Sequence, residues 1–304
     1  MEYRKIQLTG ESTYIVSLPK TWVTKNKIEK GDVVYVIEKG EEVILRLKEE
    51  KEREVEIKIK TNDLEFLGRL LITKYIQGYD TIVFSAKDHL DHRIRENLIQ
   101  VSSFLIGLEP FGESKDSITF RMLMKGGKNA MESIERMHDL SILSLRELID
   151  YIDSGMSNES MLNGIIQRDN EIDKFYFLIL RQLSTTDGFE SIIYGQVAKS
   201  LERISDHIET VASLLKEGKR MKPDDYKLFR QVADLYEDVM LTLKNRDLTS
   251  AEEILQKIQK FRVAEKKIMS NLDDTGAKNI LVYASFRRIG EYISDIAESV
   301  INLS

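Results

Sequence analysis

The second half of the chain is built for long helices. Between Ala130 and the C-terminal residue there is one proline, Pro223, and apolar residues recur at heptad spacing. That spacing places an apolar stripe on one face of each helix, which is typical of an antiparallel bundle. The last stripe steps alternately by four and three residues: Val282, Phe286, Ile289, Ile293, Ile296, Val300 and Leu303. The predicted helices span about 130–154, 158–184, 188–217, 224–246, 249–272 and 277–303.

Two of these helices are similar in sequence, which indicates a duplication. Residues 201–212 align with residues 286–297 at a constant offset of 85. The coinciding pairs are Arg203 and Arg288, Ile204 and Ile289, Ile208 and Ile293, and Ala212 and Ala297. The bundle therefore divides into two three-helix repeats, 130–218 and 223–304.

The first 125 residues have a different pattern. Residues 1–48 show short apolar alternations separated by turn signals such as Gly10 and Gly31-Asp32, which predicts strands. Residues 53–125 alternate in the order β-α-β-α-β-β, which predicts a small α+β layer domain of unassigned role. The expected fold is multidomain: an all-β N-terminal domain (1–48), a central α+β domain (53–125) and an all-α bundle (130–304).

Charge is distributed unevenly along the chain. Residues 1–48 hold nine Lys and Arg against seven Asp and Glu, whereas residues 127–304 hold 24 against 30. A basic module on an acidic body suggests a polyanion partner for the N-terminus alone. The absence of cysteine excludes disulfides, thiolate metal sites and cysteine nucleophiles. No apolar run reaches the roughly 18 residues of a membrane span, and no signal-peptide core is present, so we expect a cytoplasmic protein without membrane insertion.

Carboxylates interrupt the apolar stripes of the second and fifth helices. Asp169 interrupts the stripe of Leu162, Ile165 and Ile172, and Glu265 holds the matching position in the other repeat. A carboxylate in an apolar stripe is costly unless it meets a cation or a hydrogen-bond donor. Its appearance at the same place in both repeats predicts a function for it.

Further acids lie on the third helix. Glu202 and Asp206 are four residues apart and share a helix face, so a neighbouring helix would bring Asp169, with Asp173, close to them. Facing carboxylate oxygens suit a divalent metal or iron. The alternative is neutralisation by nearby cations, for which Arg168, Lys199 and Arg203 are the candidates.

The N-terminal sequence resembles the SpoVT/AbrB/MazE swapped-hairpin family. The similar segments are Arg4-Lys-Ile-Gln-Leu8, Tyr14-Ile-Val-Ser-Leu-Pro-Lys20 and Lys30-Gly-Asp-Val-Val34. The resemblance implies an obligate homodimer of interleaved hairpins that presents basic residues to DNA. The residues implied are Arg4, Lys5, Lys20, Lys25 and Lys27. Glu11 departs from this basic pattern, and the alternative is a hairpin that only dimerises the chain.

The helical half resembles the PhoU phosphate-uptake regulators. Leu201-Glu-Arg-Ile-Ser-Asp-His207 is similar to their E-R-I-G-D-H signature, and Asp169-Asn-Glu-Ile-Asp173 to the segment in the preceding helix. The resemblance implies a metal site at Asp169, Glu202 and Asp206, with Asp173. The second repeat departs from the family, because Arg287 stands at the Glu202 position. Its own acids, Glu265, Glu291 and Asp295, form a second candidate set, and the alternative is that Arg287 takes the place of a metal there.

Together the two resemblances match archaeal-type regulators. They imply a phosphate-responsive transcriptional regulator of phosphate uptake, with DNA and a transporter ATPase subunit or a signalling protein as partners. The first alternative is an adaptor that acts on the transporter or on a sensor kinase without binding DNA. The second is a carboxylate-metal enzyme. We do not expect an enzyme. Di-iron bundles have a histidine three residues after a glutamate, in a Glu-x-x-His motif, and neither Glu202 nor Glu265 has one.

Overall fold

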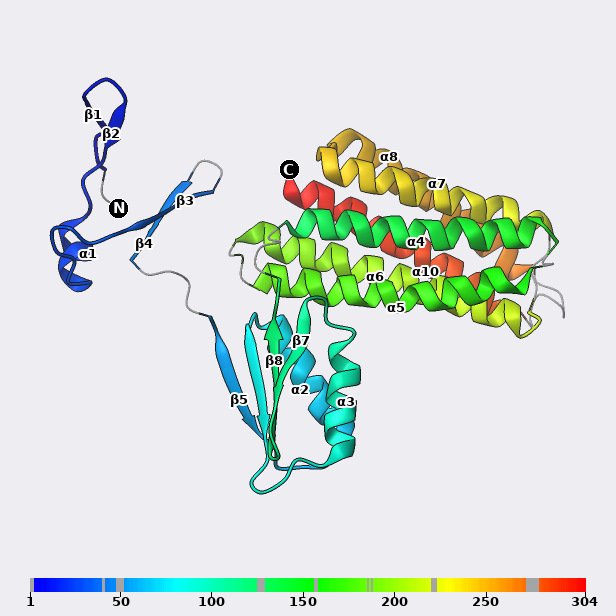
Figure 1. Cartoon of the computed structure of the whole chain (residues 1–304). Helices are drawn as coiled ribbons and strands as arrows, with labels where there is room; N and C mark the ends of the chain where they lie inside the picture. Colours follow the sequence, from blue (N-terminus) through cyan, green and yellow to red (C-terminus); the bar gives the residue numbers. More distant parts are fainter. Residues whose placement is uncertain are drawn as a thin grey trace. The chain divides into compact units, whose positions relative to one another are not determined.

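The structure is a computed structural model that describes residues 3–39, 42–47, 52–124, 129–155, 158–184, 186, 188–219, 223–271 and 279–304. The chain forms two compact units, Met1–Glu52 and Arg53–Ser304. The first is rich in strands, and the second joins a small α/β layer to a helical bundle (Figure 1). This agrees with the fold class that the sequence predicts.

Among its described residues, the N-terminal unit contains two hairpins and one short helix. Strand β1 (Gln7–Thr9) pairs antiparallel with β2 (Thr13–Ile15), and β3 (Tyr35–Lys39) pairs antiparallel with β4 (Glu42–Arg46). Helix α1 (Lys20–Lys25) is an addition to the all-β fold expected from the sequence. Pro19 precedes the helix at φ −61°, an angle that suits a helix start, so it acts as the N-cap rather than as a simple turn residue.

This unit has no core of its own. None of its described residues is buried, and α1 contains no buried residue. The exposed apolar side chains include Tyr14 at 74%, Val33 at 73%, Val36 at 63% and Val43 at 64%. So much apolar surface in a 52-residue unit is typical of a fold that needs another surface to cover it.

The α/β layer follows the predicted order closely. Its elements are β5 (Glu54–Lys58), α2 (Leu64–Ile76), β6 (Thr81–Ser85), α3 (His92–Ser102), β7 (Leu108–Glu113) and β8 (Ser117–Met122). The sheet order is β5-β6-β8-β7, with β5 and β6 parallel and the other pairs antiparallel. Leu71 and Tyr75 of α2 pack with Ile82 and Phe84 of β6 in the core of this layer. Burial on alternate residues of β6 and on one face of α2 explains why periodicity predicted these elements.

Over the residues that the structure describes, six long helices form the bundle. They are α4 (Ala130–Asp153), α5 (Glu159–Ser184), α6 (Phe189–Lys216), α7 (Pro223–Asn245), α8 (Leu248–Ser270) and α10 (Ile280–Leu303). All seven residues of the last predicted stripe are buried, so the heptad interpretation of α10 is confirmed. The predicted ends at 272 and 277 lie outside the described residues. In the described parts of the chain, every helix is too short or too polar to cross a membrane.

One buried arginine joins the bundle to the α/β layer. Arg181 of α5 has a side chain that is 10% exposed, and it donates to Tyr75 O at 2.7 Å and to Tyr79 O at 2.8 Å. It also pairs with Asp80 at 3.0 Å. These acceptors lie at and just after the C-terminal end of α2, where helix carbonyls lack intrahelical partners. Arg181 therefore fixes α2 against α5.

Candidate functional site

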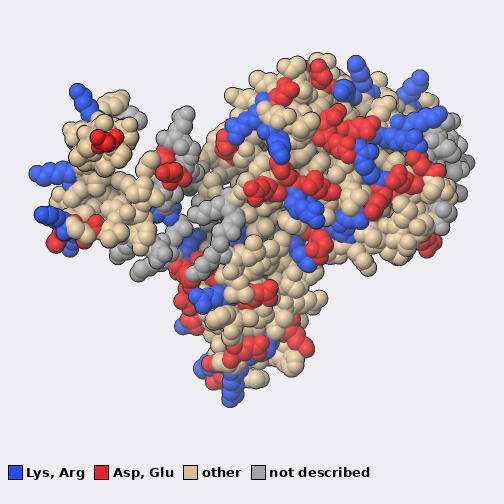
Figure 2. Space-filling view, turned by 45° about the horizontal axis from the view of Figure 1, so that its top comes forward, with Lys and Arg blue, Asp and Glu red and all other residues tan. Residues whose placement is uncertain are grey.

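The basic residues predicted to contact DNA are all exposed on the N-terminal unit. Lys20 and Lys25 begin and end α1, and Lys27 follows two residues later with a positive φ of 53°. Arg4 and Lys5 precede β1. Lys and Arg side chains stand out from this unit in Figure 2. Helix α1 therefore brings three of the five predicted cations into one short segment.

A group of acids lies where α5 packs on α6. We call Asp169 and Asp173 of α5, with Glu202, Asp206 and Glu209 of α6, the acidic face. The buried Ser205 hydroxyl of α6 donates to Asp169 Oδ1 at 2.6 Å and so ties the two helices together. Asp169 therefore finds the hydrogen-bond donor that a carboxylate in an apolar stripe requires.

The acids are close enough to disturb one another's ionisation. Burial raises the pKa of Asp173 to about 6, with the charges of Asp169, Asp206 and Glu202 adding to the rise. Burial likewise raises the pKa of Asp206 to about 6, together with the charges of Glu202 and Asp169. The pKa of Asp169 is raised by burial, although the Ser205 hydroxyl opposes the rise. The acidic face therefore holds negative charge that its surroundings do not fully compensate.

Two of the acids have a cation from their own helix. Lys199 Nζ donates to both carboxylate oxygens of Glu202 at 2.8 Å, and Arg203 pairs with Asp206 at 3.0 Å. Arg168 instead pairs with Glu147 of α4 at 2.9 Å. The neutralisation alternative from the sequence thus applies to Glu202 and Asp206 through Lys199 and Arg203.

Whether the acidic face can hold a metal depends on the ion pairs that Glu202 and Asp206 already form. Within the described residues, no three acidic or histidine side chains are grouped so that they could hold an ion. The donors are carboxylate oxygens, which suit hard cations. A metal would have to draw Glu202 from Lys199 and Asp206 from Arg203. The donor chemistry fits a cation, whereas the present arrangement of side chains does not form a site.

In the second repeat, the carboxylate that interrupts the apolar stripe has different surroundings. Glu265 of α8 is 3% exposed, and its Oε1 has no hydrogen-bond partner among the described residues. The counterpart of Ser205 is Gly290, where a Cβ would lie 3.0 Å from a ring carbon of Phe261. This repeat therefore has no room for a hydrogen-bond donor at the position that corresponds to Ser205. Burial raises the pKa of Glu265, while Arg287 opposes the rise.

Arginines surround the remaining acids of this repeat. Arg288 pairs with Glu291, and Arg287 Nε lies 3.8 Å from Glu291 Oε1. Burial raises the pKa of Asp295, and the charge of Glu298 adds to the rise. Arg287 acts on both Glu265 and Glu291, as the alternative interpretation of this set requires. The second predicted metal set, Glu265, Glu291 and Asp295, is thus a group of acids with arginines beside it.

Comparisons with known proteins match two parts of this chain. Residues 134–215, from α4 to α6, match the family described as the PhoU domain. This part of the chain is therefore similar to the PhoU domain. Residues 7–53 match the family described as "Antidote-toxin recognition MazE, bacterial antitoxin". No curated protein matches the chain.

A solved structure is similar to part of this chain. It is the crystal structure of the phosphate transport system regulatory protein PhoU from Streptococcus pneumoniae, at 19% sequence identity and a TM-score of 0.45. The similarity covers 57% of this chain and 92% of that one.

Residues 134–215 contain the whole acidic face, including two features that the sequence did not predict. Ser205 holds Asp169, and Glu209 raises the pKa of Asp169. Glu209 follows Glu202 and Asp206 at steps of four and three, so helical spacing could have identified it. Nothing in the sequence marked Ser205 as the donor, because the pairing depends on how α5 and α6 pack.

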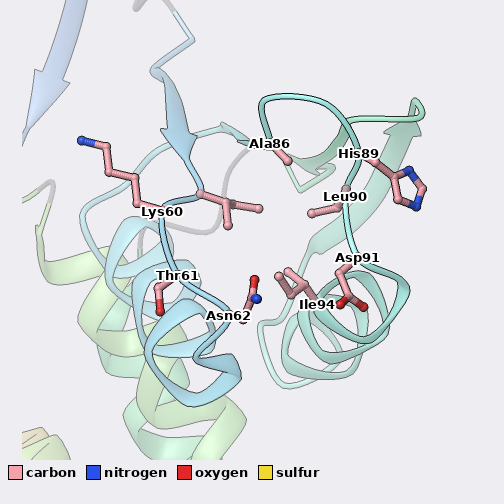
Figure 3. A pocket seen from close by; sticks show the side chains of 9 residues that line it. Lys60, Thr61, Asn62, Ala86, His89, Leu90, Asp91 and Ile94 are labelled. Atoms are coloured by element: carbon pink, nitrogen blue, oxygen red, sulfur yellow. The ribbon is translucent and has the colours of Figure 1, made fainter.

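A hollow of about 360 Å³ lies in the α/β layer, at the C-terminal ends of β5 and β6. Figure 3 shows Leu90 and Ile94 facing it, whereas Lys60 and His89 point away. The ring of His89 instead lies 3.1 Å from the carbonyl oxygen of Lys115. Thr61, Asn62 and Asp91 also line the hollow, but its two basic side chains turn away from it, so it offers no cation to an anionic ligand. The candidate sites are the basic N-terminal unit and the acidic face.

Proposed function

We propose that this protein is a phosphate-responsive transcriptional regulator of phosphate uptake that acts in the cytoplasm. It binds DNA through the N-terminal unit and receives its signal through the helical bundle. The observation that carries the proposal is the joining, in one chain, of a MazE-type segment with exposed lysines and a PhoU domain. The first links the chain to DNA and the second to phosphate regulation.

The DNA-binding step requires a homodimer. A second copy would cover the apolar surface of the N-terminal unit and double the number of cations offered to a duplex. Lysine acts as a point charge, so Lys20, Lys25 and Lys27 would contact phosphates rather than read bases. Arg4 and Lys5 would extend the same contact. Glu11, exposed in the turn between β1 and β2, opposes it.

Duplex binding measured against salt concentration tests this step. Binding should weaken as salt rises, with a slope set by the number of phosphates neutralised. Arg4→Glu combined with Lys20→Glu should abolish binding, and Lys30→Glu, which changes another exposed lysine of the unit, should leave most of it. A dimeric wild-type sample that retains no duplex at low salt would contradict the proposal.

The acidic face is the proposed signal-receiving site in the bundle. We propose that it takes up a divalent metal or iron, through which phosphate status changes the bundle. The uncompensated charge at Asp169 and Asp173 supports this proposal, since a cation would relieve it. Glu202 and Asp206 would then exchange their lysine and arginine partners for the metal.

Elemental analysis of untagged protein, purified without added metal, tests the metal proposal. The wild type should contain a stoichiometric cation, and the triple variant Asp169→Asn/Glu202→Gln/Asp206→Asn should lose it. Asp238→Asn, an exposed acid on α7, is the matched control. Equal metal content in the triple variant and the wild type would exclude the acidic face as the site.

The second candidate function is an adaptor. Under this hypothesis the N-terminal unit only dimerises the chain, and the bundle binds a phosphate-transporter ATPase subunit or a sensor kinase. The exposed Glu11 within the basic hairpin favours it. The Arg4→Glu/Lys20→Glu variant separates the two functions, because a regulator loses DNA binding whereas an adaptor continues to bind every partner protein.

A further inference from the structure

The second half of α8 carries a group of cations that have no acidic partner. Five basic residues occur between positions 257 and 267, and all are exposed. We call them the basic face of α8: Lys257, Lys260, Arg262, Lys266 and Lys267. In the described part of the chain, none of their side chains forms an ion pair or a hydrogen bond. Arg262 alone acts on an acid, since its charge opposes the rise that burial causes in the pKa of Asp295.

On the other helices of the bundle, most Lys and Arg side chains have a partner. Arg146 pairs with Glu237, Arg230 with Asp153, and Lys244 with Glu135. Among the described Lys and Arg residues of α4, α5, α6, α7 and α10, Arg136 alone lacks a comparable contact. Because the bundle segment 127–304 has an excess of acids, unpaired cations gathered on one helix need an explanation other than average composition.

The helix holds these cations on a rigid support. Ile254, Ile258 and Phe261 on the opposite side of α8 are buried in the core. Lys260 and Lys267 are seven residues apart and share one flank, while Arg262 and Lys266 share the other. From Lys257 to Lys267 the helix advances about 15 Å, at about 1.5 Å per residue. The five charges therefore form a short, straight, two-sided track.

The side chains on this track identify the class of partner. Protein interfaces are enriched in aromatic residues and arginine and depleted in lysine. The basic face has four lysines and one arginine, and Val263, 67% exposed, is the large apolar residue between them. Lysines held as point charges along a track suit a row of phosphates, which lie about 3.4 Å apart per strand along a duplex.

We propose that the basic face of α8 is a second DNA contact, which grips the phosphate backbone without reading sequence. The inference rests on the proposed function, in which the N-terminal unit already holds the duplex. Once that unit is bound, the tethered bundle meets DNA at a high effective concentration, so a few phosphate contacts suffice. The acidic remainder of the bundle would keep every other surface away from the duplex.

The test measures duplex affinity of the full chain over a range of salt concentrations. Lys260→Gln/Lys267→Gln should lower the slope of log affinity against log salt by about 1.8 for each protomer whose α8 contacts the duplex, because each phosphate that is no longer neutralised removes about 0.9. Lys260→Arg/Lys267→Arg keeps both charges and should keep the wild-type slope. Both pairs are exposed, and circular dichroism verifies that each variant is folded.

The outcomes separate this inference from the proposed function. A slope that is unchanged in Lys260→Gln/Lys267→Gln, with binding still abolished by Arg4→Glu/Lys20→Glu, overturns the α8 contact alone. Binding that survives Arg4→Glu/Lys20→Glu but falls on neutralising α8 supports the α8 contact and contradicts the N-terminal site. A wild type that binds no duplex overturns both.

Two other occupants of this face are checked with the same variants. The glutamine pair is compared with wild type for sedimentation with phosphatidylserine vesicles and for molar mass by light scattering. A loss of vesicle binding or a change of mass, with an unaltered duplex slope, overturns the DNA contact in favour of a lipid surface or a second copy.

Discussion

At the scale of single residues, the hydrogen bond from Ser205 to Asp169 decides whether a carboxylate can stay in an apolar stripe. Ser205→Ala removes a donor that is buried beside a half-buried carboxylate. We expect a loss of about 1.5 to 3 kcal/mol in the free energy of unfolding, the usual size for a hydrogen bond to a charged group. Urea unfolding near pH 7.5 measures it.

A double-mutant cycle isolates the pair. In an Asp169→Asn background, Ser205→Ala should cost clearly less than in the wild type, because the charged acceptor is already gone. An equal cost in both backgrounds would mean that Ser205 stabilises α6 by packing and not through Asp169.

The raised pKa of Asp173 has a defined consequence for stability. Its folded pKa of about 6 lies above the ordinary value of 3.8, so the folded state holds the proton more tightly. This stabilisation is full below about pH 4 and is lost as the pH rises through 6. In metal-free protein, Asp173→Asn should therefore raise the melting temperature at pH 7.5, and the gain should shrink towards zero at pH 4.5.

Thermal unfolding in chelator across this pH range tests the expectation. Asp238→Asn on α7 is the matched control, and it should show no such pH dependence. If Asp173→Asn has the same effect at both pH values, the pKa of Asp173 is not raised as the structure indicates. If the acidic face takes up the proposed metal, adding that metal should reverse the sign at pH 7.5, since the variant would then lack a ligand.

At the scale of elements, α5 serves both the acidic face and the α/β layer. Asp169 and Asp173 lie in its middle, and Arg181 near its end clamps α2. Arg181→Met would leave Tyr75 O, Tyr79 O and Asp80 without that donor. Breaking a buried charged pair costs about 3 to 5 kcal/mol. We expect the α/β layer to unfold before the bundle, and hydrogen exchange at α2 to rise sharply.

Lys174→Met on the same helix is the control for Arg181→Met. Lys174 contacts Glu171 at 2.7 Å, close to the surface, so its removal should cost less than about 1 kcal/mol. A single cooperative transition in Arg181→Met, with unchanged exchange at α2, would show that apolar contacts alone hold the layer in place.

The elements also show what the sequence can and cannot predict. Heptad stripes and a single proline predicted the long helices, because burial on one face leaves a periodic trace in the sequence. Helix α1 was missed, since Thr21, Val23 and Thr24 are β-branched and favour a strand. The pairing of Glu202 with Lys199 was only one of several alternatives, because it depends on rotamers that leave no pattern in the sequence.

At the scale of the whole molecule, the N-terminal unit has too little buried surface to stand alone. If it is an isolated monomer, Val36→Asp and Val43→Asp change exposed residues and should cost almost nothing. If a second copy covers them, each substitution buries a charge at the interface. Burying a valine side chain contributes about 1.5 kcal/mol or more. The pair should therefore raise the dimer dissociation constant by at least about a hundredfold.

Light scattering over a range of protein concentrations distinguishes these cases. We expect the wild type to be a dimer and Val36→Asp/Val43→Asp to dissociate into monomers with an intact helical signal, since the bundle has its own core. Lys30→Asp, an exposed change outside the apolar set, should leave the dimer unaltered. The dissociated variant should also lose duplex binding, because a monomer offers half the cations. A double variant that stays dimeric would place the dimer contact elsewhere, and the hairpins would then have no partner to explain their exposed apolar residues.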